Sequence, residues 1–384
     1  MRQEGGLQPK KILLTGGHAA TTAISVVEEF IRENAAFSPS SNEKKYRWDI
    51  YWVGSKYAIE GRKVPTLEFK TLPKFGVKHF SIAAGRLQRK FSIWTIPSLA
   101  KIPLGFVSAA ILVRKIKPDV ILSFGGFAAF PVVFVGYLFG IPIIIHEQTA
   151  VCGRANKLSS YFATKIALAR ATSINFFQKE KCVVVGNPIM TQIREISPKE
   201  KIGAPPTLYV TGGSRGAQKI NNLVEEILEP LLDEFLLIHQ VGYIDYDKFE
   251  KRKSELPDNL KEKYEIYDTI DPLQLDGVYK RADIIVARAG ANTVAEIIAV
   301  KRPAILIPLP FSYLNEQTKN ALFAQKYKIV KILNQEGLKG ITLLKEIKSL
   351  KKNWYALVGK IARFKSPDID ASHKLVQIVK DVLR

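Results

Sequence analysis

VILSFGGFAAFPVVFVGYLFGIPIII, residues 120–145, contains no charged side chain and is long enough to suggest a membrane span. Its glycines and prolines indicate otherwise. The Gly-Gly pair would end a buried strand, Pro131 suits the first turn of a helix and Gly140 its end, and a second strand starts near Pro142. The helix between them would be roughly 15 Å long, half of the ~30 Å that a bilayer core requires. We therefore interpret the stretch as strand, helix, strand in a parallel sheet covered on both faces.

Strand-like and helix-like segments alternate along the rest of the chain, which is typical of α/β layers. KKILLTGGH at 10–18 is a strand followed by a glycine turn, and YVTGGS at 209–214 repeats this pattern. We expect two doubly wound halves, joined by the Pro-, Lys- and Glu-rich segment 187–206. Further strands are expected at 47–55, 234–242, 263–270, 282–290, 302–310 and 328–333, and helices at 22–34 and 217–232.

Composition narrows the class of protein. The chain has 384 residues, 47% hydrophobic, with a mean hydropathy of +0.01, which is typical of a globular protein of about two domains. A net charge of +21 favours an anionic partner or substrate. Cys152 and Cys182 are too few for a disulfide framework or a four-cysteine zinc site. The polar residues 1–11 lack the apolar core of a signal peptide, so we expect a reducing, cytoplasmic setting.

The segment 69–118 contains no acidic residue, although many cations and large apolar side chains alternate in it. Such a mixture is attracted to an anionic bilayer surface, and we name Arg86, Arg89, Lys90 and Trp94 as the expected membrane contacts. The alternative is an ordinary basic face whose aromatic residues belong to the core. Nucleic acid is disfavoured as a partner because no helix-turn-helix, zinc or RNP-like motif is present.

Four glycine-containing turns follow expected strands, beginning at Thr15, Phe124, Gly212 and Arg288. Glycine lets a ligand approach the backbone, and the helix N-terminus that follows offers N–H groups and partial positive charge to a phosphate. A single turn of this kind is more readily explained by tight strand–helix packing; four together favour phosphate binding. The chain has neither a complete dinucleotide G-x-G-x-x-G fingerprint nor a P-loop Lys-Ser/Thr, which argues against NAD and ATP chemistry.

These motifs occur in a combination that resembles the MurG family, UDP-N-acetylglucosamine transferases that complete lipid II in peptidoglycan synthesis. The resemblance extends over nearly the whole chain and rests on KPDVILSFGGF, IPIIIHEQ, VVGNP, VTGGSRGAQKIN, ADIIVARAGANTVAEI, NEQTKNA and SPDIDASHKLVQIV. It implies an α/β fold of two doubly wound Rossmann-like domains with an interdomain cleft, the glycosyltransferase-B fold. The acceptor and membrane-facing domain would be 1–186, with a closing helix at 368–384 packed back on it, and the UDP-sugar domain would be 187–367.

The resemblance also implies roles for individual residues. Ser214 would lie beside the diphosphate or uridine, and Glu296 would accept hydrogen bonds from ribose hydroxyls, although a carboxylate early in a helix is also common without a ligand. Gln317 would contact sugar hydroxyls, its amide both donating and accepting. The full set expected to bind substrate is Thr15, Gly16, Gly17, Thr149, Asn156, Arg194, Ser214, Ile270, Ala291, Asn292, Thr293, Val294, Glu296 and Gln317.

Two side chains are candidates for catalysis. His18 follows the first glycine turn at an expected helix N-terminus, where the dipole disfavours imidazolium, so a neutral ring could act as general base. It could equally only position the acceptor or the turn. Glu147, in HEQ, is a second candidate for orienting or deprotonating the acceptor, whereas His146 is expected to be structural.

The chain departs from the family pattern mostly where the acceptor would bind. Leu13-Leu14 replace glycines before TGGH, Ala19 to Thr22 replace an aromatic-proline step, and Thr149-Ala150 replace Asn-Gly. Met190 stands where an arginine is expected, and Arg194, four residues on, could substitute for it.

The expected reaction is the transfer of N-acetylglucosamine from its UDP donor to lipid I, an undecaprenyl-diphosphate-linked muramyl peptide, with inversion, by an enzyme peripheral to the cytoplasmic face of the membrane. Alternatives are a related transferase acting on diacylglycerol or another lipid, and a non-catalytic basic protein that binds membrane or RNA. No cofactor and no dedicated metal site are expected, with Mg²⁺ at most a stimulating ion.

Overall fold

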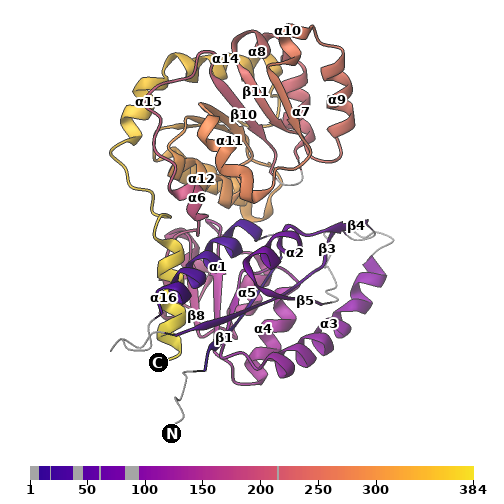
Figure 1. The fold of residues 1–384 in the computed structure, drawn as a ribbon, viewed down its shortest axis with the longest axis vertical. Helices are drawn as coiled ribbons and strands as arrows, with labels where there is room; N and C mark the ends of the chain where they lie inside the picture. The colour runs from indigo at the N-terminus through magenta and orange to yellow at the C-terminus, as the bar shows by residue number, and fades with distance from the viewer. Residues whose placement is uncertain (1–7, 18, 38–45, 60–61, 83–94, 214–215) are drawn as a thin grey trace. The chain divides into compact units, whose positions relative to one another are not determined.

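The computed structural model describes residues 8–17, 19–37, 46–59, 62–82, 95–213 and 216–384, and they form two compact units (Figure 1). Unit 1 contains residues 1–190 and 370–384, and unit 2 contains residues 191–369. The boundaries expected from sequence were 186/187 and 367/368. Each unit is built around its own parallel sheet, which confirms the two doubly wound α/β domains.

Unit 1 is a parallel sheet covered by helices. Among the described residues it has seven strands in the order β5 (Lys78–Ser81), β2 (Trp48–Gly54), β1 (Lys10–Gly16), β6 (Val120–Ser123), β7 (Ile143–Glu147), β8 (Lys165–Leu168) and β9 (Cys182–Val184). Its helices are α1 (Ala20–Ala35), α2 (Leu67–Thr71), α3 (Thr95–Ile116), α4 (Ala129–Leu138), α5 (Arg154–Ser159) and α16 (Ala371–Val382), and a small hairpin pairs β3 (Tyr57–Ile59) with β4 (Arg62–Pro65).

The uncharged stretch 120–145 forms β6, α4 and most of β7, as its punctuation predicts. Every residue of both strands is buried, because the strands lie inside the sheet with helices on its faces. A Cβ on Gly136 would lie 2.2 Å from Ile121 Cδ1, so this glycine allows α4 to pack closely on β6. None of the described helices is both long and apolar enough to cross a membrane.

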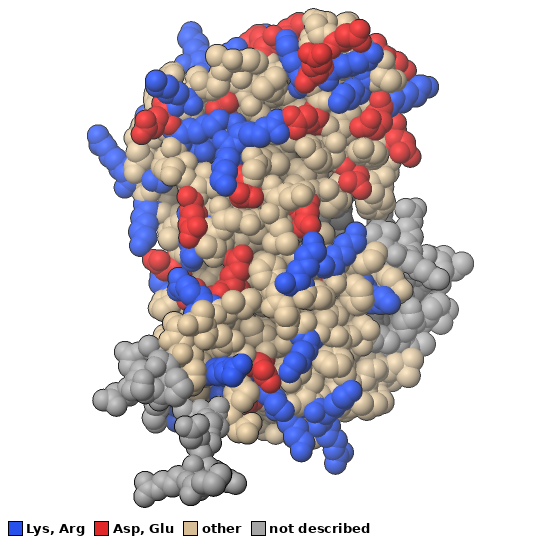
Figure 2. Space-filling view, viewed as in Figure 1, with Lys and Arg blue, Asp and Glu red and all other residues tan. Residues whose placement is uncertain are grey.

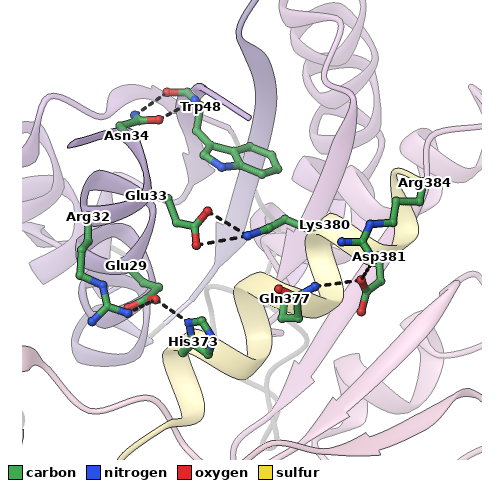
Figure 3. A network of polar contacts seen from close by, with 10 residues as sticks. All are labelled: Glu29, Arg32, Glu33, Asn34, Trp48, His373, Gln377, Lys380, Asp381 and Arg384. Carbon is green, nitrogen blue, oxygen red and sulfur yellow. Dashed lines mark hydrogen bonds and ion pairs between the residues drawn. The ribbon is translucent and has the colours of Figure 1, made fainter. Parts of the chain in front are cut away.

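The end of the chain joins unit 1 through polar contacts between α16 and α1 (Figure 3). His373 Nδ1 lies 3.0 Å from Glu29 Oε1, and Lys380 Nζ donates to Glu33 Oε2 over 3.0 Å. The three ligand atoms of Glu29, Glu33 and His373 are close enough to hold a metal ion. However, Arg32 already pairs with Glu29, and Lys380 with Glu33, so each carboxylate has a cation partner and the cluster acts as an attachment of α16.

Unit 2 repeats the architecture. Its sheet, within the described part of the chain, has the order β12 (Tyr264–Tyr267), β11 (Leu236–Gln240), β10 (Thr207–Thr211), β13 (Ile284–Ala287), β14 (Ala304–Leu306) and β15 (Val330–Ile332), with all pairs parallel. The helices are α6 (Thr191–Arg194), α7 (Gln218–Glu225), α8 (Leu228–Glu234), α9 (Tyr246–Ser254), α10 (Asp258–Lys261), α11 (Leu275–Arg281), α12 (Ala291–Val300), α13 (Glu316–Gln325), α14 (Gly340–Lys352) and α15 (Trp354–Ile361).

The single helix predicted at 217–232 is wrong, because the segment forms two helices, α7 and α8. The break falls at Ile227, whose φ of −126° is not helical. Pro230 explains it: proline has no N–H to give, and its ring would clash with the carbonyl four residues earlier in a continuous helix. In the third position of α8, by contrast, proline is tolerated because those amides lack a partner within the helix.

Candidate functional site

The first two glycine turns of unit 1 pack directly on each other. Thr15 and Gly16 end β1, and the Gly17 N–H donates to Gly125 O over 3.0 Å. A Cβ on Gly126 would lie 3.1 Å from Gly17 N, so the close approach requires glycine there. This packing gives the glycines a structural reason that needs no ligand. His18 lies outside the described residues, as do Arg86, Arg89, Lys90 and Trp94.

Glu147 is the centre of a hydrogen-bonded loop after β7. Its Oε1 accepts from the Thr149 N–H and hydroxyl at 3.1 and 2.7 Å, and its Oε2 accepts from the Gly153 N–H and Asn156 Nδ2 at 2.8 and 3.0 Å. The side chain is only 2% exposed. With four donors already directed at it, this carboxylate is well placed to shape the loop and poorly placed to take a proton from an acceptor.

Three of the residues expected from sequence thus meet in one network: Glu147, Thr149 and Asn156. Asn156 Nδ2 also donates to His146 O over 3.1 Å. The ring of His146 is fully buried, and its Nε2 lies 3.0 Å from Gly186 O. Because a carbonyl oxygen can only accept, Nε2 must carry the proton. This is the structural role expected of His146.

In unit 2, the turn after β13 leads into the N-terminus of α12. The N-cap, Gly290, supplies no side-chain acceptor, and the first turn of α12 contains no acidic residue. The Val294 N–H donates within the helix to Gly290 O over 3.0 Å, so an anion at this N-terminus would rely on the amides of residues 291–293. Asn320 supports the turn, since its Nδ2 donates to Ala289 O over 3.1 Å.

Glu296 lies in the second turn of α12 and is 6% exposed. The Tyr279 hydroxyl donates to its Oε2 over 2.8 Å. Burial raises the pKa of Glu296 to about 7, against the smaller opposing effect of the Tyr279 hydrogen bond. The Tyr279 ring packs edge-on against Tyr209, with 5.9 Å between ring centroids. A carboxylate that is half protonated near neutral pH responds strongly to any new hydrogen-bond donor.

Tyr279 and Asn320 were not expected from the sequence as site residues. Asn320 could have been found, because it belongs to the NEQTKNA motif. Tyr279 offered no such signal, since it lies outside the quoted motifs and 17 positions before Glu296.

Gln317 fastens the loop that precedes α13. Its Oε1 accepts from the Leu309 N–H at 2.9 Å, and its backbone N–H donates to Ser312 Oγ over 3.2 Å. Between them, Leu314 and Asn315 have left-handed φ values of 53° and 54°, which are costly for residues other than glycine. The side-chain oxygen of Gln317 is therefore engaged within the protein, and Nε2 is the group suited to donating to a ligand.

The remaining expected residues are scattered. The Arg194 guanidinium donates to Ile369 O at 3.3 Å, inside unit 2. Ile270 is buried in the loop after β12. In the third glycine turn, a Cβ on Gly212 would lie 2.2 Å from Ala217 N, so packing alone requires glycine there. Ser214 lies outside the described residues.

Comparison with known proteins defines the class first. Family models match residues 44–168, as the glycosyltransferase family 28 N-terminal domain, and residues 207–375, as the C-terminal domain. The fold resembles that of MurG from Acinetobacter baumannii, with a TM-score of 0.65 and 23% identity over 97% of this chain and 100% of that one. UDP-GlcNAc 2-epimerase from Neisseria meningitidis has a similar fold, with a TM-score of 0.66 and 13% identity over 97% and 100%. The chain is a glycosyltransferase with the two-domain glycosyltransferase-B fold.

The family follows from curated relatives. A protein of Clostridium botulinum is 31% identical over 365 residues, which cover 93% of this chain and 95% of the relative. One from Bacillus cereus is 30% identical over 354 residues, covering 90% and 92%. Both are named UDP-N-acetylglucosamine–N-acetylmuramyl-(pentapeptide) pyrophosphoryl-undecaprenol N-acetylglucosamine transferase, the second with the number 2. The chain belongs to the MurG family of glycosyltransferases, as its motifs predict.

Proposed function

We propose that the enzyme transfers N-acetylglucosamine from UDP-N-acetylglucosamine to the 4-hydroxyl of the muramyl sugar of lipid I. The observation that carries the proposal is the arrangement on α12, where uncapped N-terminal amides stand one turn before the buried carboxylate of Glu296. Amides of this kind suit a diphosphate, and a buried carboxylate suits two ribose hydroxyls. The names of the relatives support the same donor and acceptor.

The reaction needs stabilisation of charge on the departing UDP and removal of one proton. The acceptor oxygen forms a bond to the anomeric carbon as the bond to the diphosphate oxygen breaks, with inversion. The N-terminal amides of α12 would stabilise the leaving diphosphate, a contribution typically worth about 10²–10³ in rate for one preorganised donor. The proton would go to His18, because each carboxylate oxygen of Glu147 already accepts two hydrogen bonds from the protein. On this proposal, neither a resident metal nor a cofactor takes part.

The acceptor is lipid-linked, and α3 offers a surface for reaching it. One side of α3 is buried through Ala109, Val113 and Ile116. Another side exposes more than half of each of three aliphatic side chains, Leu104, Val107 and Ile111. Apolar residues beside cations are typical of proteins that insert shallowly into an anionic bilayer.

Charge supports the same surface. Arg114, Lys115 and Lys117 are exposed at the end of α3. Figure 2 shows Lys and Arg with few acidic side chains on one face of unit 1, whereas unit 2 mixes both signs. We therefore add the aliphatic stripe of α3 to Arg86, Arg89, Lys90 and Trp94 as the proposed membrane contact, and place the enzyme at the cytoplasmic face of the membrane.

Incubation with radiolabelled UDP-N-acetylglucosamine tests the reaction. Label should pass to a lipid I analogue and not to diacylglycerol, and a chelator should not abolish transfer. Transfer to diacylglycerol alone would establish the related lipid transferase in its place. Absence of both transfer and UDP binding by calorimetry would favour the non-catalytic basic protein.

Sedimentation with anionic vesicles tests the membrane surface. Changing Leu104, Val107 and Ile111 to Ser should weaken binding on the order of a hundredfold, because each side chain contributes roughly 1 kcal/mol when its exposed part is buried. A control variant changes three exposed aliphatic residues of unit 2 to Ser: Ile244, Leu322 and Ile341. Equal vesicle binding by both variants would exclude the α3 stripe.

A further inference from the structure

The N-terminus of α1 is capped from outside the helix. Its N-cap residue, Ala19, has no side chain that could accept a hydrogen bond, and the first turn contains no acidic residue. Instead, the Ala19 N–H donates to Glu68 Oε1 over 2.8 Å. Glu68 belongs to α2 and is 3% exposed, so a buried carboxylate lies against the positive end of the α1 dipole.

Thr66, two residues before Glu68, holds the start of α2 in place through hydrogen bonds. Thr66 caps α2, its Oγ1 accepting from the Phe69 N–H at 3.2 Å, while its hydroxyl donates to Ser55 O over 3.1 Å. The Thr66 N–H donates to Lys56 O over 3.0 Å. These bonds tie α2 to the segment just after β2 and direct its first turn at α1.

The space beside this carboxylate is small. Gly16, Gly17, Trp52 and Glu68 are among the residues lining a cavity of about 10 Å³, room for one water molecule. A hydroxyl group fits such a space and can donate to a carboxylate, whereas a phosphate group carries the same sign of charge as Glu68 and would be repelled.

We propose that Glu68 is a positioning residue that caps α1, fixes the backbone beside residue 18, and restricts the first glycine turn to a neutral hydroxyl instead of a phosphate. The role in transfer rests on the proposed function, because residue 18 is the proposed base and the muramyl sugar would supply the hydroxyl. The capping role does not depend on it. The glycine-containing turns at the starts of α1 and α12 would then bind chemically different groups.

Hydrogen exchange followed by mass spectrometry tests the cap in the full chain. The peptide at the start of α1 should exchange faster in Glu68→Ala than in the wild type, and it should stay protected in Glu68→Gln, whose amide oxygen still accepts the Ala19 N–H. Added inorganic phosphate should slow its exchange in Glu68→Gln only, because the repelling charge is gone. Wild-type exchange rates in Glu68→Ala, or equal phosphate protection in the wild type, would overturn the proposal.

Turnover tests the positioning role. Glu68→Ala should lose at least about tenfold in kcat with its Kd for UDP unchanged, and Glu68→Gln should recover part of the loss. Glu180→Gln, an exposed glutamate of unit 1, serves as the control. Full kcat in Glu68→Ala would refute the positioning role while leaving the proposed function intact. A wild type without transferase activity would refute the proposed function, and the exchange measurements would still decide the cap. If Glu68→Ala does not fold, Glu68→Gln and the wild type with phosphate still decide it.

Discussion

UDP binding should tighten about tenfold between pH 6 and pH 8 because of one buried carboxylate. Burial raises the pKa of Glu296 to about 7 in the free protein, so the group holds a proton through most of the acidic range. Ribose hydroxyls that donate to Glu296 need it ionised. Below pH 7 binding must therefore first remove a proton, and affinity falls. Above pH 7 the proton is already gone, and affinity is constant.

The magnitude follows from the ionised fraction, which is roughly 0.09 at pH 6 and 0.9 at pH 8 for a pKa near 7. Their ratio is about ten, or ~1.4 kcal/mol in binding free energy. Near pH 6, about nine-tenths of a proton should leave the protein with each ligand bound.

Titration calorimetry at pH 6, 7 and 8 measures both quantities, with proton release obtained from buffers of different ionisation enthalpy. The UDP phosphate itself titrates near pH 6, so uridine serves as a second ligand that lacks this group. Glu296→Gln retains the titration of UDP and should lose the step at pH 7. A uridine affinity that is equal at pH 6 and pH 8 in the wild type, or a pH dependence of uridine binding that survives in Glu296→Gln, would refute the reasoning.

Three further substitutions test neighbouring contacts. Tyr279→Phe removes the hydrogen bond that lowers the pKa of Glu296, so the midpoint of the UDP pH profile should move upward. An unchanged midpoint would mean that Tyr279 does not influence the pKa of Glu296. Glu147→Gln replaces one carboxylate oxygen with an NH₂ group, which in place of Oε2 would face the Gly153 N–H and Asn156 Nδ2. It should lower the free energy of unfolding by roughly 1–3 kcal/mol in urea titration, whereas unchanged stability would deny the loop network. Gly125→Ala places a Cβ 2.6 Å from Asn156 Oδ1 at a φ of +80° and should cost about 1–3 kcal/mol or more in the same assay; a cost below the error of measurement would mean that Asn156 moves freely.

The fold could be predicted from local features of the sequence. In residues 120–145, glycine and proline mark strand and helix ends within a few positions of where they occur, so the absence of charge did not mislead. The wrong prediction, one helix at 217–232, weighed the apolar periodicity above Pro230, although a proline inside a helical pattern is itself a local signal.

The properties of the site were harder to predict from the sequence, because its electrostatics come from residues distant in sequence. The motifs drew attention to Glu296, but its raised pKa depends on burial, which no motif reports. Similarly, HEQ suggested Glu147 as a base, while the structure surrounds that carboxylate with donors from Thr149, Gly153 and Asn156. A residue type in a motif indicates what chemistry is available, and its neighbours decide whether the group is free to perform it.

The same reasoning separates the glycine turns of the two units. Each turn follows a buried strand and begins a helix, so both predict amides that could hold an anion. At α12, no acidic side chain lies in the first turn, and Glu296 bonds to Tyr279. At α1, Glu68, 49 residues away, already supplies the negative charge. Since a second anion there would meet a buried carboxylate, we expect the turn at α12 to bind the diphosphate and the turn at α1 to bind the acceptor hydroxyl.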